Sequence, residues 1–287
     1  MRYVVIRLLS FLLIGVVVVS CSDTNNAPAP TTNTSIRDEN LALGNPSGAT
    51  TDASNYTNYL LVKPQYTLSY HRDRGIPNWV SWHLSSAWLG TADRQNNFTA
   101  DNGLPTGWYR VTTSSYTGSG FDRGHNCPSA DRTGSIEDNS ATFLLSNIMP
   151  QAPNNNQRTW VGLENYCRTL VDQGNELYII CGSYGKGGVG SNGAASTLDN
   201  GRVTVPDRCW KVVVVLPVGS DDVKRVSTST RVIAIDIPND NSVNTSWASY
   251  RTTVDIIEQA TGYDLLSVVS TSVQKILEAS VDTGPTN

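Results

Sequence analysis

Histidine, charge and long apolar runs are all scarce in this chain of 287 residues. Only three histidines occur, His71, His83 and His125, which argues against a histidine-rich zinc enzyme. Charged residues make up 16% of the chain, too few for a coiled coil or a highly charged disordered protein. Lys and Arg number 21 against 25 Asp and Glu, and the net charge of −4 excludes a polybasic binder as a description of the whole chain.

Two common ligand-binding motifs are also absent from the sequence. No two cysteines have the Cys-x2-Cys spacing of a zinc site. The glycine-rich stretch 185–193 lacks the spacing of a P-loop or of a dinucleotide-binding turn. Apolar residues nevertheless make up 39% of the chain, enough to bury a sizeable core in one large domain or two small ones.

The one long apolar run lies at the N-terminus and is typical of a targeting segment. Arg2 and Arg7 give it a positive start, and residues 8–19 are apolar but too few for a comfortable membrane span. The run ends at Cys21 in a pattern that resembles a bacterial lipobox. This resemblance implies a signal peptide over residues 1–20, cleavage before Cys21 and a lipid on its sulfur. The chain is then an exported bacterial lipoprotein of the cell envelope, at the outer membrane or cell surface; the alternative is a plain secretory signal followed by a chance cysteine.

The rest of the chain divides into a tether, a domain and a tail. Residues 21–39 are rich in Ser, Thr, Asn, Pro and Ala, so they cannot bury enough apolar surface to offset their ordering entropy. They predict a flexible tether. We expect a single catalytic domain over residues 40–280 and a short tail over residues 281–287.

The domain contains four cysteines, Cys127, Cys167, Cys181 and Cys209. An even count in an exported chain predicts two disulfides, and three pairings are open. We expect Cys181 to pair with Cys209, because both lie in strand-like runs, which leaves Cys127 with Cys167. Isolated buried thiols are the alternative.

Apolar patterning predicts strands over residues 59–62, 66–70, 79–84, 176–182, 210–217 and 231–238, and helices over 156–171, 249–260 and 272–279. Residues 142–148 fit either a strand or a buried turn, and the Gly/Ser-rich stretch 182–200 predicts a flexible loop. Strands and helices mix without strict alternation. We therefore expect an α+β fold with a mixed, mostly antiparallel central sheet flanked by helices.

Chemistry is concentrated in residues 119–134, where His125 lies close to Arg123 in a glycine-flanked segment. A histidine titrates near neutral pH and can serve as a general base, and the planar fork of an arginine suits phosphate oxygens. Asparagine oxygens, which follow at 154–156, suit a hard cation such as Mg²⁺ that keeps several waters. These are the parts of metal-assisted phosphodiester hydrolysis. A purely structural histidine and arginine are the alternative.

A longer set of residues resembles the DNA/RNA non-specific endonuclease family, which has the ββα-metal, or His-Me finger, active site. The residues that carry the resemblance are Asp122-Arg123-Gly124-His125, Pro128-Ser129-Ala130-Asp131-Arg132, Asn147-Ile148-Met149-Pro150-Gln151, Asn156, Trp160, Leu163 and Glu164. They occur in the family's order and spacing, and the resemblance runs from about residue 43 through the last predicted helix.

The resemblance implies a metal-dependent endonuclease that hydrolyses phosphodiester bonds in DNA and RNA without strong sequence preference. In that family pattern His125 deprotonates the attacking water. Asn156 is the direct protein ligand of Mg²⁺, or of another divalent cation such as Mn²⁺, and the ion stabilises the leaving oxygen. Glu164 holds water bound to that ion. The expected partners are DNA, RNA and a membrane through the lipid on Cys21; no protein partner is predicted.

Three further residues are expected at the substrate. Arg123 contacts phosphate or braces the site, with an ion pair to Asp122 as the alternative. Asn147 positions the base or the water network, or is a buried turn residue. Some relatives place an arginine, after an aromatic strand, where this chain has His83. We therefore expect Arg94 to stabilise the transition state in its place, and His83 to lie in the core or at an interface.

Charge does not draw nucleic acid to the domain as a whole. Residues 64–185 contain eight Arg, no Lys and ten acidic residues, a balance of −2. Binding then rests on a local cleft of arginines, with Trp79, Trp82 and Trp88 as stacking surfaces unless they belong to the core. Two other functions stay open. One is a non-catalytic surface lipoprotein that uses the nuclease scaffold for binding, and the other is a phosphodiesterase with a smaller substrate.

Overall fold

The computed structural model describes Met1 and residues 37–286. The predicted signal peptide, Cys21 and most of the predicted tether lie outside the described residues. Among the residues that are described, no helix combines the length and the apolar character that crossing a membrane requires.

The strands are β1 (Tyr59–Val62), β2 (Thr67–His71), β3 (Ile76–Leu84), β4 (Asp122–His125), β5 (Ile148–Gln151), β6 (Asn175–Tyr184), β7 (Gly188–Gly190), β8 (Gly193–Ala195), β9 (Thr197–Leu198), β10 (Val203–Thr204), β11 (Arg208–Pro217), β12 (Arg231–Pro238) and β13 (Arg251–Thr252). The α-helices are α1 (Ile136–Ala141), α2 (Val161–Asp172), α3 (Asp222–Arg225), α4 (Val254–Thr261) and α5 (Thr271–Leu277). A π-helical segment, η5 (Asn155–Trp160), leads directly into α2.

A seven-stranded sheet in the order β1-β2-β3-β6-β11-β12-β13 forms the centre of the domain. Every pair of neighbouring strands within it is antiparallel. The longest pairing joins β6 and β11 along their full length. The predicted α+β fold with a mostly antiparallel sheet is confirmed. The strands predicted over 59–62 and 231–238 have the predicted bounds, and the other strands of the sheet differ at their ends by a few residues.

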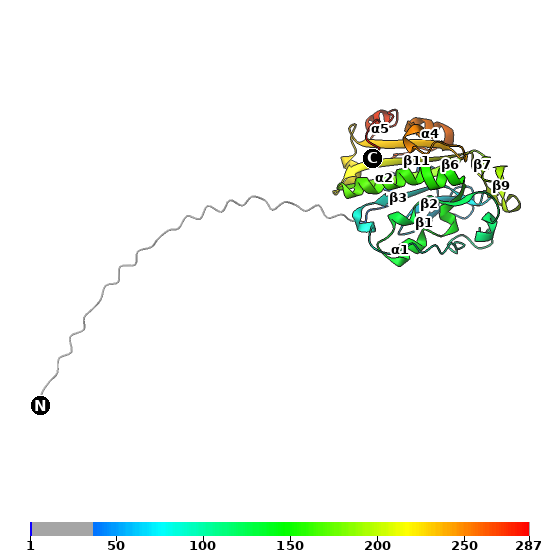
Figure 1. The fold of residues 1–287 in the computed structure, drawn as a ribbon. Coiled ribbons are helices and arrows are strands. Elements are labelled where there is room, and N and C mark those ends of the chain that lie inside the picture. The colour runs from blue at the N-terminus through cyan, green and yellow to red at the C-terminus, as the bar shows by residue number, and fades with distance from the viewer. Residues whose placement is uncertain (2–36, 287) are drawn as a thin grey trace. The chain divides into compact units, whose positions relative to one another are not determined.

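Both faces of this sheet are covered, so the domain has three layers (Figure 1). Along β11, Val213 packs in a core with Leu163 of α2, while Val212 and Val214 pack in a second core with Val254 of α4. This alternation follows from the two-residue side-chain period of a strand. A strand buried on both faces needs apolar residues at successive positions, which explains the continuous valine run of β11.

Two regions differ from the sequence prediction. The predicted loop 182–200 contains the β7–β8 hairpin and also β9, because its glycines and small residues allow tight turns. The predicted helix 249–260 begins only at Val254. The residues before it include β13, which pairs with β12 at the edge of the sheet. The helix is capped at Gly262, whose φ of 74° is the left-handed conformation that glycine favours.

The predicted domain boundaries are too narrow at both ends. Arg37 donates to the carbonyl of Ala87 at 3.0 Å and to Asp138 at 2.9 Å, so residues 37–39 belong to the fold rather than to the tether. At the other end, Asp282 is buried and forms an ion pair with Arg231 at 2.8 Å. The predicted tail is therefore part of the domain at least as far as this residue.

The disulfide prediction is wrong, because all four domain cysteines are free and buried. Cys181 and Cys209 do lie on neighbouring strands, but the register pairs Cys181 with Lys211 and Cys209 with Ser183. The two cysteines are therefore offset diagonally rather than directly opposite each other. Burial raises the pKa of Cys127 and Cys167 to about 12, so these thiols are held in their neutral, unreactive form.

The predicted aromatic stacking surfaces lie in the core. Trp79 and Trp82 are fully buried and Trp88 is 3% exposed. Trp82 donates its ring N–H to Asp131 at 3.0 Å, and Arg132 stacks over Trp88 with 4.0 Å from its Cζ to the ring centre. Trp82 and Trp88 thus support the segment that follows His125, Trp79 donates to the hydroxyl of Ser47, and none of the three is free to stack on bases.

Candidate active site

The segment with the histidine folds as two strands and a helix. β4 ends at His125 and pairs with β5 in antiparallel register, and the chain then enters η5 and α2. The two strands approach closely at Gly124, where a Cβ would lie 2.3 Å from Oε1 of Gln151. Only glycine fits this position, which explains structurally why a glycine precedes His125. The predicted ββα arrangement is therefore present.

His125 is held between two aromatic rings. Its ring centre lies 5.3 Å from that of Phe98 and 5.0 Å from that of Phe143. The side chain is buried, and its Nε2 has no hydrogen-bond partner within the described part of the chain. Burial, followed by the positive charges of Arg94 and Arg123, lowers the pKa of His125 to about 3. At neutral pH the imidazole is therefore uncharged and has a free ring nitrogen.

The two arginines are positioned by the same rings that hold the histidine. The Cζ atom of Arg123 lies 4.1 Å from the ring centre of Phe98, and that of Arg94 lies 4.9 Å from the ring centre of Phe143. Nη1 of Arg94 also donates to the hydroxyl of Ser129 at 2.6 Å. Burial, mainly, lowers the pKa of Arg94, and a desolvated guanidinium of this kind gains from an anionic ligand.

Asn156 faces the same region from η5. Its Nδ2 donates to Oδ2 of Asp122 at 2.8 Å, and Nε2 of Gln157 donates to the same oxygen at 2.9 Å. Because the amide nitrogen is bound in this way, the amide oxygen is left as the group that can bind a ligand. Asp122 therefore orients Asn156 across the motif, from the first strand to the helix.

Glu164 lies on α2 and is 9% exposed. Its Oε1 is 3.7 Å from Nζ of Lys211, whose ammonium lies 4.2 Å from the ring centre of Trp160. Burial raises the pKa of Glu164, while the nearby charges of Lys211 and Arg94 lower it. Lys211 is 1% exposed, so Glu164 is part of a buried charge network behind Arg94.

These elements border a cleft of about 390 Å³. Arg94, Phe98, Asp122, Arg123 and Asn156 line it, together with residues of the segment 113–121. His125 lies beside this lining, in contact with Phe98. Two guanidinium groups and an amide thus come together at one polar cleft, an arrangement suited to an anion and a hard cation, and the buried imidazole of His125 lies next to its lining.

Comparison with known proteins identifies the family. The model of the DNA/RNA non-specific endonuclease family matches residues 44–272. A curated protein named Nuclease from Nostoc sp. is 50% identical over 92% of this chain and 94% of its own length. The chain belongs to the DNA/RNA non-specific endonuclease family. It is a hydrolytic enzyme of the nuclease class.

More distant relatives agree with this assignment. The human mitochondrial nuclease EXOG is 30% identical over 66% of this chain and 50% of its own length. A solved structure of the EndoG/EndoGI complex contains a chain with a TM-score of 0.64 and 22% identity, covering 80% of this chain and 91% of that one. This last likeness shows that the fold is shared.

Within this endonuclease fold, Asn147 does not reach the substrate cleft. It is fully buried, and its Nδ2 donates to the carbonyls of Cys127 and Thr142 at 2.8 and 2.9 Å. Its Oδ1 accepts from the backbone N–H of Cys127 at 3.0 Å. Asn147 therefore takes the buried turn position that was the alternative to a substrate role, and its amide fixes the chain just after His125.

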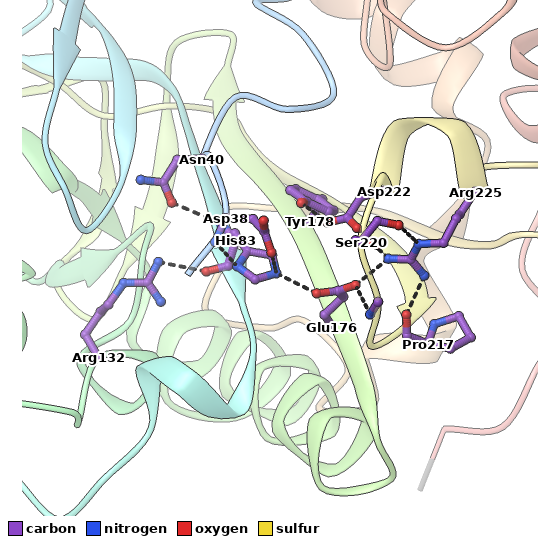
Figure 2. Close-up of polar contacts among 11 residues, drawn as sticks. Asp38, Asn40, His83, Arg132, Glu176, Tyr178, Pro217, Ser220, Asp222 and Arg225 are labelled. Carbon is purple, nitrogen blue, oxygen red and sulfur yellow. Dashed lines mark hydrogen bonds and ion pairs between the residues drawn. The ribbon is translucent and has the colours of Figure 1, made fainter. Parts of the chain in front are cut away.

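His83 lies in the core, the placement that we expected (Figure 2). Its Nδ1 accepts from the backbone N–H of Asp38 at 3.2 Å, and its Nε2 lies 3.3 Å from Oε2 of Glu176. Arg225 binds Glu176 from the other side and Asp222 at 2.6 Å. Four potential metal ligands meet here, and His83 and Arg225 partner Glu176 and Asp222, while Oδ2 of Asp38 has no hydrogen-bond partner among the described residues.

Three side chains that support the candidate site were not predicted from the sequence. Phe98 and Phe143 hold the histidine and both arginines, and Lys211 neutralises Glu164. A lysine directly before the valine run of β11 was the available signal, because a charged residue in a strand buried on both faces requires a partner. Nothing in the sequence pattern indicated that the two phenylalanines face His125.

Proposed function

We propose that this endonuclease cleaves phosphodiester bonds within DNA and RNA, with Nε2 of His125 as the general base. The observation that carries the proposal is this unpartnered nitrogen, held in its neutral form between Arg94 and Arg123 beside the cleft. A water oxygen attacks phosphorus while its proton passes to Nε2. The bond between phosphorus and the 3′ oxygen breaks, and this oxygen takes a proton from solvent water, which leaves a 3′ hydroxyl and a 5′ phosphate; His125 then returns its proton to solvent.

A base of such low intrinsic pKa needs the substrate to raise its basicity. An anionic phosphate in the cleft offsets the positive charge of the two arginines, so the pKa of His125 rises when substrate binds. The arginines also stabilise the charge that develops on the phosphate oxygens in the transition state. Arg94 lies over the ring of Phe143 at the cleft and its pKa is lowered mainly by burial, and we assign it the main part of this stabilisation.

The residues of the cleft fit a divalent metal ion. The amide oxygen of Asn156 is left available because Asp122 holds the amide nitrogen, and a single neutral oxygen ligand suits Mg²⁺, which retains most of its waters. Mn²⁺ has similar ligand preferences. When bound, such an ion supplies a positive charge that stabilises the leaving oxygen. We assign Glu164 the ordering of water on the α2 side of the cleft.

Contacts of this type favour low sequence specificity. Arginines that bind phosphate oxygens read the backbone, which all sequences share. The tryptophans that could have stacked on bases are buried in the core. We therefore expect cleavage of single-stranded and double-stranded DNA and of RNA.

The test is a nuclease assay on plasmid DNA and on RNA, with and without EDTA. We expect His125→Ala to lose at least about 10²-fold in rate with the fold retained, because general-base catalysis contributes 10²–10⁴-fold. His71→Ala is the matched control, since His71 is half-buried on β2 outside the cleft. Cleavage by His125→Ala at the parent rate would overturn the assignment of the base, and undiminished cleavage in EDTA would overturn the metal.

We also propose that the chain is exported and held at a membrane of the cell envelope by a lipid on Cys21. The support is the sequence pattern alone, an apolar run that ends at this cysteine. The full chain is expected to enter the detergent phase of a Triton X-114 extract, whereas Cys21→Ala enters the aqueous phase. Equal partitioning of the two would rule out the anchor.

A further inference from the structure

A second group of carboxylates lies far from the histidine in sequence, where α4 meets the end of α5 (Figure 1). Asp255 and Glu258 lie on α4, and Glu278 is the C-terminal cap residue of α5. The two segments are joined by a hydrogen bond from the backbone N–H of Asp255 to the carbonyl of Glu278 at 3.1 Å. The three acidic side chains are thus brought to one place by backbone packing.

The geometry of these carboxylates matches the coordination sphere of one calcium ion. One oxygen from each of the three side chains lies within 4.8 Å of the other two. Calcium binds oxygen at about 2.3–2.6 Å, so ligands on opposite sides of the ion are about 5 Å apart. Asp255 is exposed and Glu258 is half-buried, which leaves an open side where water completes the coordination.

Glu278 is the residue that most needs a cation. It is only 8% exposed, and its Oε1 has no hydrogen-bond partner within residues 37–286. Its position at the C-terminal end of α5 adds the negative end of the helix dipole to the charge of three carboxylates. Burial, and then Glu258, Asp255 and Asp264, raise the pKa of Glu278 to about 7. The charged groups that act on it are all acidic.

The cluster around Glu176 shows how this protein neutralises buried acids elsewhere (Figure 2). There Arg225 bridges Glu176 and Asp222, and His83 approaches Glu176 from the other side. At the α4–α5 junction, by contrast, no basic side chain of the described chain forms an ion pair with any of the three carboxylates. One oxygen of Glu258 accepts from the backbone N–H of Leu265 at 2.6 Å, and this bond supplies no full positive charge.

We propose that Asp255, Glu258 and Glu278 bind a calcium ion that joins α4 to the end of α5, separately from the metal of the catalytic cleft. The ion neutralises the clustered carboxylates and fills the position that Oε1 of Glu278 faces. It stabilises the layer that these two helices form over the β11 side of the sheet. Catalysis does not depend on this ion, because the junction contains no residue of the cleft.

The test is thermal unfolding of the full chain in EDTA and in CaCl₂, together with calorimetric titration of CaCl₂. We expect calcium to raise the Tm of the parent, and Glu278→Gln to lose this shift and to weaken the calcium Kd by at least about tenfold, since a charged ligand is removed. Asp255→Asn is a second variant with the same expected loss. Glu137→Gln is the matched control, because Glu137 is an exposed acid on α1, and its calcium response should equal that of the parent.

The variant Asn156→Ala distinguishes calcium binding at the α4–α5 junction from calcium binding in the catalytic cleft. This variant should keep the rise in Tm that calcium causes in the parent. Glu278→Gln should retain the parent nuclease rate in Mg²⁺. The proposal is overturned if Glu278→Gln keeps the calcium shift, or if the shift disappears with Asn156→Ala instead. It is also overturned if calcium does not change the Tm of the parent. If Glu278→Gln then has a higher Tm than the parent in EDTA, protonation of Glu278 alone is enough to neutralise the cluster.

Discussion

Asp122 binds Asn156 across the active-site motif, with 2.8 Å between Oδ2 of the acid and Nδ2 of the amide. The first residue of the strand that ends in His125 thus orients the expected metal ligand on the following helix. The segments that contain the proposed base and the proposed metal ligand are thus joined by one charge-assisted hydrogen bond. Residues that orient a metal ligand in this way typically contribute as much to metal binding as some ligands do.

Removing this acceptor should weaken metal binding without unfolding the protein. For Asp122→Ala, we expect the Mg²⁺ concentration that gives half-maximal cleavage to rise by about 10–100-fold. The measurement is the rate of plasmid cleavage over a Mg²⁺ titration. Gln157→Ala is the control, because Gln157 binds the same oxygen at 2.9 Å without orienting a ligand. If both variants have the same Mg²⁺ dependence as the parent, Asp122 does not position Asn156.

Lys211 should be essential for stability through Glu164. Lys211→Met removes one member of a buried pair, and the cost is expected to be about 3 kcal/mol in the free energy of unfolding. Adding Glu164→Gln should restore much of this stability, because no uncompensated charge is left, but should not restore activity. Urea unfolding provides the measurement. Lys224→Met is the control, because Lys224 is 79% exposed and its surface pair with Asp221 is screened by solvent, so its loss should leave the free energy of unfolding close to that of the parent.

Acid should destabilise the fold partly through His125. Burial and the two arginines lower its pKa from 6.5 to about 3, so the unfolded chain takes up a proton in this range that the folded chain does not. Stability therefore falls as pH decreases from 6.5 toward 3, by at most about 1.4 kcal/mol per pH unit from this group. Urea unfolding of the parent and His125→Ala at about pH 7 and about pH 4.5 measures the difference. An identical pH slope in both proteins would contradict the lowered pKa.

Reducing agent should not affect the domain. Because all four domain cysteines are free thiols in the core, the Tm is expected to be the same with and without dithiothreitol. Alkylation without reductant should modify all four only after unfolding by guanidinium, since each side chain is buried. Mass spectrometry counts the modified cysteines. A lower Tm in dithiothreitol, or cysteines that are not alkylated in the unfolded chain, would indicate disulfides instead.

The family and the candidate site could be predicted from the sequence, because the resemblance depends on residue types at short spacings. His125, Arg123, Asn156 and Glu164 all lie within about forty residues of one another, in one hairpin and the helix that follows. Local hydrogen bonds and helix periodicity are sufficient to relate such residues. The valine-rich strands and the antiparallel sheet could be predicted for the same reason, since their patterns are local.

Only the tertiary structure decided which side chains meet across long sequence separations. The register between β6 and β11 places Cys181 and Cys209 diagonally across from each other. The apolar pattern of either strand alone does not determine this register. Packing placed Phe98 and Phe143 on either side of His125, used the amide of Asn147 for the backbone, and brought Glu278 to Asp255. Apolar burial is not directional, so a sequence indicates which residues become buried, but their neighbours depend on how the whole chain packs.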